Sequence, residues 1–136
     1  MLGFGMSESM YNSIIVCYTR SHMPDKAIEI FSEALANKIT PSRQLYTSLL
    51  LAYAYKSDPI SAEKVVKEMR AKELSLDSVV YTNLILAYKR AGQIEKCWDV
   101  FRRAEIDGAV DQYLLAYMIY ICSQVCFNLL RIEKSS

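Results

Sequence analysis

The sequence contains few of the residues that make tight turns or build metal sites. Four glycines and three prolines among 136 residues are too few for a β protein with frequent hairpins. His22 is the only histidine, so the four cysteines have little help in forming a metal site. Sixteen basic and fifteen acidic residues leave a net charge of +1. This balance argues against strong nonspecific binding to polyanions, although a local basic stripe would be compatible with it.

Signals for export or import are also missing from the start of the sequence. Residues 1–6 carry no basic side chain, and the first one is Arg20, so this segment resembles neither a signal peptide nor an arginine-rich transit peptide. Four cysteines without a secretory signal favour a reducing environment over a disulfide framework. The length fits one domain, and a hydrophobic content of 52% is enough for a core.

One segment of the sequence occurs three times at a spacing of 35 residues. Tyr81–Tyr88 corresponds to Tyr46–Tyr53 and to Tyr11–Tyr18. A fixed period of a few tens of residues is the signature of a solenoid, in which each unit is one supersecondary element. We therefore divide the chain into a lead (1–7), three units (8–42, 43–77 and 78–111), a partial fourth unit or apolar terminal helix (112–130), and a polar tail (131–136).

Within each unit the pattern predicts two helices. Apolar residues recur at i, i+3, i+4 and i+7, which gives each helix one face for the core. Ser7, Asp77 and Asp111 stand where N-caps are expected, Pro24 fits a first helical position, and Gly92 fits a turn. The expected helices include about 8–20, 24–37, 59–72, 78–91 and 93–106.

The C-terminal part of the chain is unusually apolar. Residues 113–130 contain no charged side chain and just reach the length of a transmembrane helix. Ser123, Gln124 and Asn128 interrupt this stretch, so we expect the first helix of a fourth unit, not a membrane span. No full second helix follows to cover it, and large exposed apolar surfaces mark contacts. We predict a contact with other protein subunits through Leu115, Ile119 and Phe127.

Other candidate sites are weaker. Cys122 and Cys126 lie four residues apart on a helix, but no further cysteine or histidine is near in sequence, so we expect them to be buried. Trp98 is expected in the core or between units. The sequence has no nucleophile–base pair, no phosphate-binding loop and no carboxylate dyad with a shaped site around it. We therefore expect neither an enzyme nor a bound metal or cofactor.

The eighth residue of each unit distinguishes two helical-repeat families of similar length. Tetratricopeptide units have glycine, alanine or serine there, because their two helices approach closely. This chain has Ile15, Leu50 and Ile85. With the 35-residue period and the tyrosine-led start of each unit, residues 8–126 resemble the pentatricopeptide-repeat family. The resemblance implies an all-α fold, a right-handed α-solenoid of antiparallel helix-turn-helix repeats of about 35 residues, with the first helices lining the concave side.

The resemblance also implies binding of single-stranded RNA, one base per unit, inside a mitochondrion or a chloroplast. In this family the fifth and last residues of a unit read the base. The resemblance assigns the following residues to these two positions: Asn12 with Ser42, Thr47 with Asp77, and Thr82 with Asp111. Asn with Ser suggests cytosine and Thr with Asp suggests guanine, so the expected sequence is C-G-G, running 5′ to 3′ from the first unit to the third.

Two further positions of the family pattern are only partly kept. An aliphatic wedge is expected second in each unit, where Val79 fits but Ser9 and Gln44 do not. A basic residue is expected late in the first helix, as in Arg20 and Arg90.

Two alternatives stay open from the sequence. The aspartates at the ends of the second and third units, Asp77 and Asp111, would be justified as N-caps even without RNA. Three units are also too few to select one transcript. The chain would therefore act within a ribonucleoprotein, either binding single-stranded or ribosomal RNA, or serving as a protein–protein scaffold, for instance in a mitochondrial ribosome.

Overall fold

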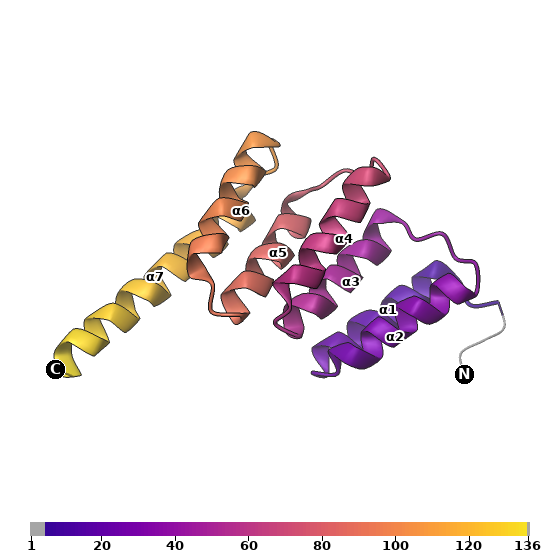
Figure 1. The fold of residues 1–136 in the computed structure, drawn as a ribbon, viewed down its shortest axis with the longest axis horizontal. Helices are drawn as coiled ribbons and strands as arrows, with labels where there is room; N and C mark the ends of the chain where they lie inside the picture. Colours follow the sequence, from indigo (N-terminus) through magenta and orange to yellow (C-terminus); the bar gives the residue numbers. More distant parts are fainter. Residues whose placement is uncertain (1–4, 136) are drawn as a thin grey trace.

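The computed structural model describes residues 5–135, and this part of the chain is entirely helical apart from turns and loops (Figure 1). The helices are α1 (Glu8–Arg20), α2 (Pro24–Ala36), α3 (Arg43–Tyr55), α4 (Pro59–Ala71), α5 (Ser78–Arg90), α6 (Ile94–Ile106) and α7 (Gln112–Ser135). The first six have 13 residues each, and α7 has 24. The predicted all-α solenoid is confirmed, and the bounds of α1, α2, α4, α5 and α6 lie within one residue of those expected.

The helix ends follow local signals in the sequence. The side chains of Ser7 and Asp77 accept hydrogen bonds from the backbone N–H groups of Met10 and Val80, as expected of N-caps. Pro24 lies in the first turn of α2, where its missing N–H costs no hydrogen bond.

The turns repeat with the same period as the helices. In the turn inside each unit, His22, Ser57 and Gly92 have positive φ, and in the loop between units Lys38, Glu73 and Gly108 do. Each set is spaced by 35 residues. A residue with left-handed backbone conformation closes the last turn of a helix, and glycine adopts this conformation with the least strain. Only the third unit has glycine both in its inner turn and in the loop that follows it.

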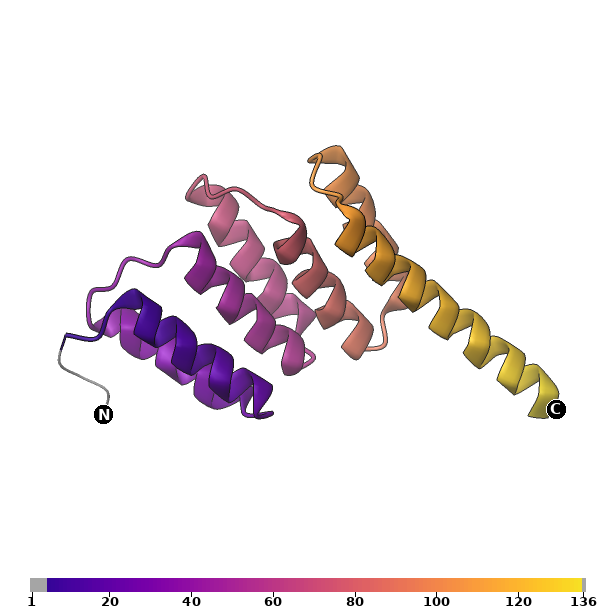
Figure 2. The same ribbon diagram turned by 180° about the vertical axis from the view of Figure 1, so that it is seen from behind.

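The helices form two layers. The first helices of the units, α1, α3 and α5, lie side by side, and α7 continues the row beyond α5 (Figure 2). The second helices, α2, α4 and α6, form the other layer, and each contacts the first helix of its own unit. We call the surface formed by α1, α3, α5 and α7 the first-helix side.

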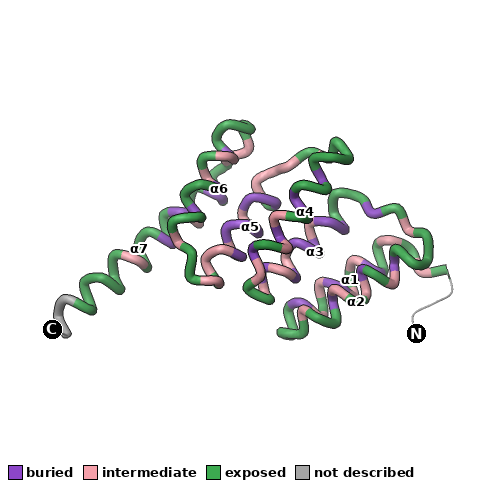
Figure 3. Tube along the Cα trace, viewed as in Figure 1, coloured by how far each residue is buried: buried purple, intermediate pink, exposed green. Residues whose placement is uncertain are grey.

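The core runs along the middle of the stack, where the two layers meet (Figure 3). The eighth residues of the units, Ile15, Leu50 and Ile85, are fully buried there. Bulky side chains at this position fill the space between the paired helices, which is why the small residues of a tetratricopeptide unit are not required.

Charged and phenolic groups join the second and third units on the second-helix side. Arg70 of α4 forms an ion pair with Asp107 at 2.7 Å, and the Tyr81 hydroxyl donates to the same carboxylate. Arg103 of α6 bonds to Glu63 of α4 at 2.8 Å. Burial and the neighbouring Asp107 carboxylate raise the pKa of Tyr81 to about 12.

We expect Tyr81 to give the protein an alkaline limit. Its pKa is raised from 10.0 to about 12 by folding, so its contribution is complete below pH 10 and is lost as the pH rises to 12. Tyr81→Phe should therefore flatten the fall of the unfolding free energy over this window by up to about 1.4 kcal/mol per pH unit. Urea unfolding at several pH values measures this slope.

The control for this measurement is Tyr113→Phe, which removes the same hydroxyl from an exposed position on α7. A slope in Tyr81→Phe equal to that of the unmodified chain would contradict the assignment.

Helix α7 differs from the other first helices. Leu114, Met118 and Ile121 are buried against the stack, but the helix then extends beyond it (Figures 1 and 3). It also continues through residues 131–135, which we expected to form a tail. No glycine or proline lies between residues 112 and 135, and leucine, arginine, glutamate and lysine favour a helix, so nothing local ends it earlier.

The surface of α7 is apolar and largely uncovered. By length and composition alone, residues 112–132 could cross a membrane, and few of them are buried. Leu115, Ile119 and Phe127, the residues of the predicted protein contact, are all exposed.

Three further residues near α7 differ from expectation. Trp98, expected in the core or between units, is 42% exposed and lies outside the core, beside α7. Cys122 and Cys126 were expected to be buried and are exposed. All three lie in the region where a second helix of a fourth unit would pack, and the described part of the chain provides no such helix.

Candidate nucleic-acid interface

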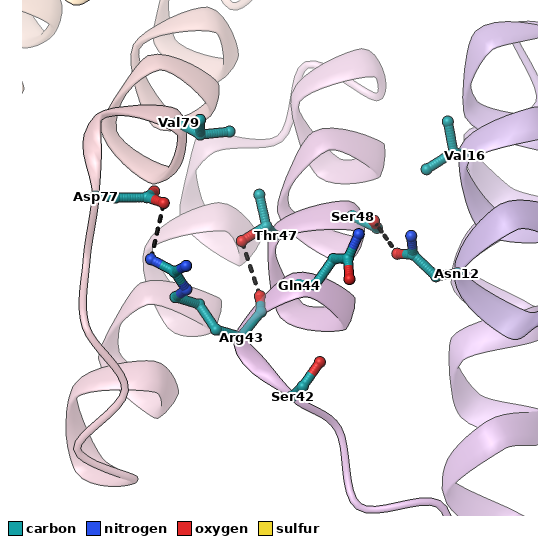
Figure 4. Close-up of a pocket in the computed structure, with 9 residues that line it drawn as sticks. All are labelled: Asn12, Val16, Ser42, Arg43, Gln44, Thr47, Ser48, Asp77 and Val79. Carbon is teal, nitrogen blue, oxygen red and sulfur yellow. Dashed lines mark hydrogen bonds and ion pairs between the residues drawn. The ribbon is translucent and has the colours of Figure 1, made fainter. Parts of the chain in front are cut away.

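A cavity of about 610 Å³ opens on the first-helix side where α1, α3 and the start of α5 meet (Figure 4). Its lining includes five of the predicted site residues: Asn12, Ser42, Thr47, Asp77 and Val79. Thus the fold brings the expected reading positions of the first and second units together, with the apolar Val79 beside them. Val16, Arg43, Gln44 and Ser48 complete the lining and were not predicted as site residues.

The fifth residues of the units present different hydrogen-bonding groups. The hydroxyl of Thr47 donates to the carbonyl of Arg43 at 2.8 Å, and that of Thr82 to the carbonyl of Ser78 at 2.7 Å. Because each hydroxyl proton is already used, the threonine oxygen can only accept from a ligand.

Asn12 has the opposite character. Its side-chain oxygen accepts a hydrogen bond from the Ser48 hydroxyl of the next unit, so its amide nitrogen is left to donate. The first unit therefore offers donors, and the second and third offer acceptors.

The last residue of each unit is bonded to the first residue of the same unit. Ser42 bonds to Glu8, Asp77 pairs with Arg43 at 2.8 Å, and Asp111 accepts from the hydroxyl of Ser78 at 2.6 Å. These pairs were not foreseen, although a charge pair at a separation of one unit, Arg43 and Asp77, is visible in the sequence. The carboxylate of the second unit is therefore neutralised by an arginine. The carboxylate of the third unit is bonded to a neutral hydroxyl instead.

Both aspartates also cap helices, as the sequence alternative required. Asp77 accepts from the N–H of Val80 at 3.1 Å, and Asp111 from that of Leu114 at 2.9 Å. The Ser78 hydroxyl and the backbone N–H of Leu114 hold the pKa of Asp111 below its usual range, so this carboxylate is charged at neutral pH. Capping uses one oxygen of each carboxylate, and the other oxygen accepts from Arg43 in the second unit and from Ser78 in the third.

The predicted basic residues lie at the other end of the first helices. Arg20 is exposed at the end of α1. Arg90 ends α5, where its guanidinium donates to the carbonyl of Tyr55 at 3.3 Å and lies 5.2 Å from the centre of that ring. Neither arginine lines the cavity, so the structure does not bring them together with the reading positions of the first and second units.

Thr82 and Asp111 also lie outside the cavity. Thr82 is on α5, and Asp111 precedes α7. They are the fifth and last residues of the third unit, and correspond to Thr47 and Asp77 in the second unit. Among the described residues there is no group of three or more histidine, cysteine or acidic side chains that could hold a metal ion.

Taken together, the chain is a helical-repeat protein that carries a polar residue at the fifth position of each of its three units. A family model described as the pentacotripeptide-repeat region of PRORP matches residues 3–109. The chain therefore belongs to the pentatricopeptide-repeat family. A comparison with curated protein sequences gave no match.

Solved structures show the same fold. The pentatricopeptide repeat protein PPR10 in complex with an 18-nt psaJ RNA element superposes with a TM-score of 0.73 at 25% identity, over 79% of this chain and 16% of that one. A C256S/C430S/C449S variant of PPR10 with the same RNA element gives 0.75 at 23% identity, over 85% and 17%. PPR10 from maize gives 0.69 at 18% identity, over 98% and 19%. The chain thus spans less than a fifth of PPR10.

Proposed function

We propose that this chain binds single-stranded RNA along its first-helix side, one base per unit, as a non-catalytic part of an organellar ribonucleoprotein. The observation that carries the proposal is the row of oriented polar groups at the fifth and last positions of the units, with Val79 beside them in the cavity. PPR10, which shares the fold, was solved with an 18-nt RNA element, which supports a nucleic-acid ligand.

The hydrogen-bonding character of each unit supports the expected C-G-G preference. Free amide protons on Asn12 suit the acceptor atoms of cytosine. The acceptor oxygens of Thr47 and Thr82 suit the N–H donors of guanine. Each oxygen of Asp111 accepts one hydrogen bond within the chain and has a second lone pair, which suits the amino group of guanine. The ion pair between Arg43 and Asp77 leaves the second unit less acidic than the third, so RNA phosphates are repelled less there.

The affinity of so few units is modest. At about 1–3 kcal/mol per stacked base, three units give about 3–9 kcal/mol before ordering costs, so micromolar binding is a generous ceiling. Selection of one transcript therefore needs further RNA-binding partners in the same assembly.

A binding experiment tests base reading directly. We expect Thr82→Val with Asp111→Ser to weaken binding of a short strand carrying C-G-G by roughly tenfold or more, because the Thr82 hydroxyl and the Asp111 carboxylate are lost. Serine keeps an N-cap for α7, so circular dichroism should show unchanged helicity. Fluorescence anisotropy at low salt measures the affinity, with an all-uridine strand as the comparison ligand.

The control variant is Thr40→Val, the same substitution at an exposed loop threonine outside the cavity. Equal binding of the C-G-G strand by the double variant, or no binding by the unmodified chain at low salt, would reject base reading.

The uncovered surface of α7 favours a second candidate function, a protein–protein scaffold in a mitochondrial ribonucleoprotein such as the ribosome. In this role the RNA would be touched without base selection. Purification of the native assembly, with or without nuclease treatment, separates the two. Loss of the assembly after nuclease supports RNA binding, and its persistence supports the scaffold.

We infer a mitochondrial location from the family resemblance, with the chloroplast as the alternative. Fractionation of cells that express the tagged protein tests this location. Recovery only in the cytosol would contradict it.

A further inference from the structure

An apolar groove of about 360 Å³ runs between α6 and α7, away from the proposed RNA surface. Trp98 and Phe101 form its α6 wall, and the α7 wall includes Leu115, Ile119 and Cys122. In the first three units the second helix packs on the first helix of its own unit. For α7, the described part of the chain provides no such helix. The groove is therefore the place where a second helix of a fourth unit would lie.

The spacing of the α7 residues along this groove indicates that its occupant is a helix. Leu115, Ile119, Cys122, Cys126 and Leu129 follow one another at intervals of 4, 3, 4 and 3 residues. This is the heptad spacing by which two helices pack knobs into holes. We call these five residues the α7 seam. No charged residue lies between positions 113 and 130, so two such seams can meet without electrostatic repulsion.

We propose that the α7 seam pairs, antiparallel, with the α7 seam of a second copy of this chain, with the two-fold axis at Gln124, midway between Cys122 and Cys126. The seam is nearly symmetric about this position. In such a pair Ile119 faces Leu129 of the second copy, and Cys122 faces Cys126. Such an arrangement is closed, because the same surface is used on both partners.

The shape of the chain supports this occupant over others. The groove flanks the first half of α7, whereas the second half extends beyond the stack, and its apolar side chains Phe127, Leu129 and Leu130 are exposed (Figure 2). In an antiparallel pair the extending half of each copy lies in the groove of the other. It then runs antiparallel to the α7 that it covers, as a second helix does within a unit.

The length of α7 keeps the helical stacks of the two copies apart. At about 1.5 Å per residue, its 24 residues span about 36 Å, and the stack packs against only the first part, through Leu114, Met118 and Ile121. The two stacks therefore lie at opposite ends of the paired helices. A parallel pair would instead place both stacks at the same end and leave both grooves empty.

The mass in solution tests the pairing, with no RNA present. At tens of micromolar, light scattering should give twice the 15.6 kDa of one chain. Ile119→Glu should raise the dissociation constant at least a hundredfold and give a monomer, because it places a charge in the seam. Ile60→Glu is the control, since Ile60 is 72% exposed on α4, outside the groove, and should leave the dimer intact. A monomeric parent chain, or a dimer that survives Ile119→Glu, overturns the proposal.

The register is tested by disulfide cross-linking with copper phenanthroline, which oxidises two thiols to one disulfide. A variant that keeps Cys122 but has Cys17→Ser and Cys126→Ser should not cross-link alone, and neither should one that keeps Cys126 but has Cys17→Ser and Cys122→Ser, because each cysteine then faces a serine. An equimolar mixture of the two variants should cross-link, because Cys122 of one chain then faces Cys126 of the other. Buried Cys97 is unchanged in both. Cross-linking of either variant alone, as in a parallel pair, overturns the arrangement.

Flotation with vesicles of phosphatidylcholine and phosphatidylserine tests a lipid occupant instead. A parent chain that is monomeric and floats with the vesicles would show that α7 binds a membrane surface, and this result also overturns the proposal.

Discussion

Replacing Leu50 by alanine should lower the free energy of unfolding by about 2–5 kcal/mol. Leu50 is fully buried in the central unit, between α3 and α4, where the layers meet. The substitution removes buried methyl groups and leaves a cavity that neighbours on both sides cannot fill. In a solenoid the central unit has an interface with each adjacent unit, so the loss is felt by the whole stack. A domain of this size has about 5–15 kcal/mol of stability, so the change is a large part of it.

Urea unfolding followed by helical circular dichroism measures this effect. Ile60→Ala is the control, because Ile60 is exposed on α4 and its truncation should cost about 0.5 kcal/mol or less. A loss below about 1 kcal/mol for Leu50→Ala would mean that this position does not fill the space between the paired helices.

The double substitution Leu114→Ala with Met118→Ala should detach α7 and leave the three units folded. Both side chains are buried where α7 packs on α5, so each truncation costs about 2–5 kcal/mol. The sum of about 4–10 kcal/mol exceeds what a terminal helix with one neighbour can retain. Because contacts in a solenoid are made only with neighbours, α1 to α6 keep their own packing.

Hydrogen exchange resolved by residue measures this local opening. Amides of α7 should lose protection, while those of α3 and α5 keep it. The experiment is best done with Ile119→Glu also present, so that association through the seam does not mask the result. Tyr113→Ala with Phe127→Ala is the control, since both side chains are exposed and lie off the seam. Retained protection in α7, or simultaneous loss in every helix, would contradict the expectation.

Much of the fold could be predicted because each local signal is repeated at the same period. The tyrosines at 11, 46 and 81 start each unit, prolines open α2 and α4, and aspartate caps α5. One ambiguous signal would leave the helix ends uncertain, but three aligned copies fix them. The eighth position was informative for the same reason, since a bulky residue recurs there three times and is buried three times.

The residues of the candidate site could be predicted better than their hydrogen-bond partners. Family resemblance gave the fifth and last residues, and five of the predicted residues line one cavity. The pairs Glu8–Ser42 and Ser78–Asp111 could not be predicted, because they depend on how side chains about one unit apart are placed by packing. Each unit uses a different residue type for its partner, so no period reveals the rule.

The surroundings of α7 were predicted least well. An apolar residue on a helix is expected to be buried, and Trp98, Cys122 and Cys126 follow this expectation only if a further helix covers them. Periodicity shows which residues share a face, but not whether another element lies against it. The end of a repeat array is where this distinction matters most.

The contacts between units have a mechanical consequence. Several of them join residues about one unit apart, from 35 residues for Arg90 and Tyr55 to 40 for Arg103 and Glu63. Loops of this size close at similar entropic cost, so folding can begin in any unit and spread to its neighbours. When the two ends are pulled, the same geometry lets the chain yield one helix pair at a time. Each released unit then adds about 120 Å of extended chain, so that the protein lengthens in equal steps.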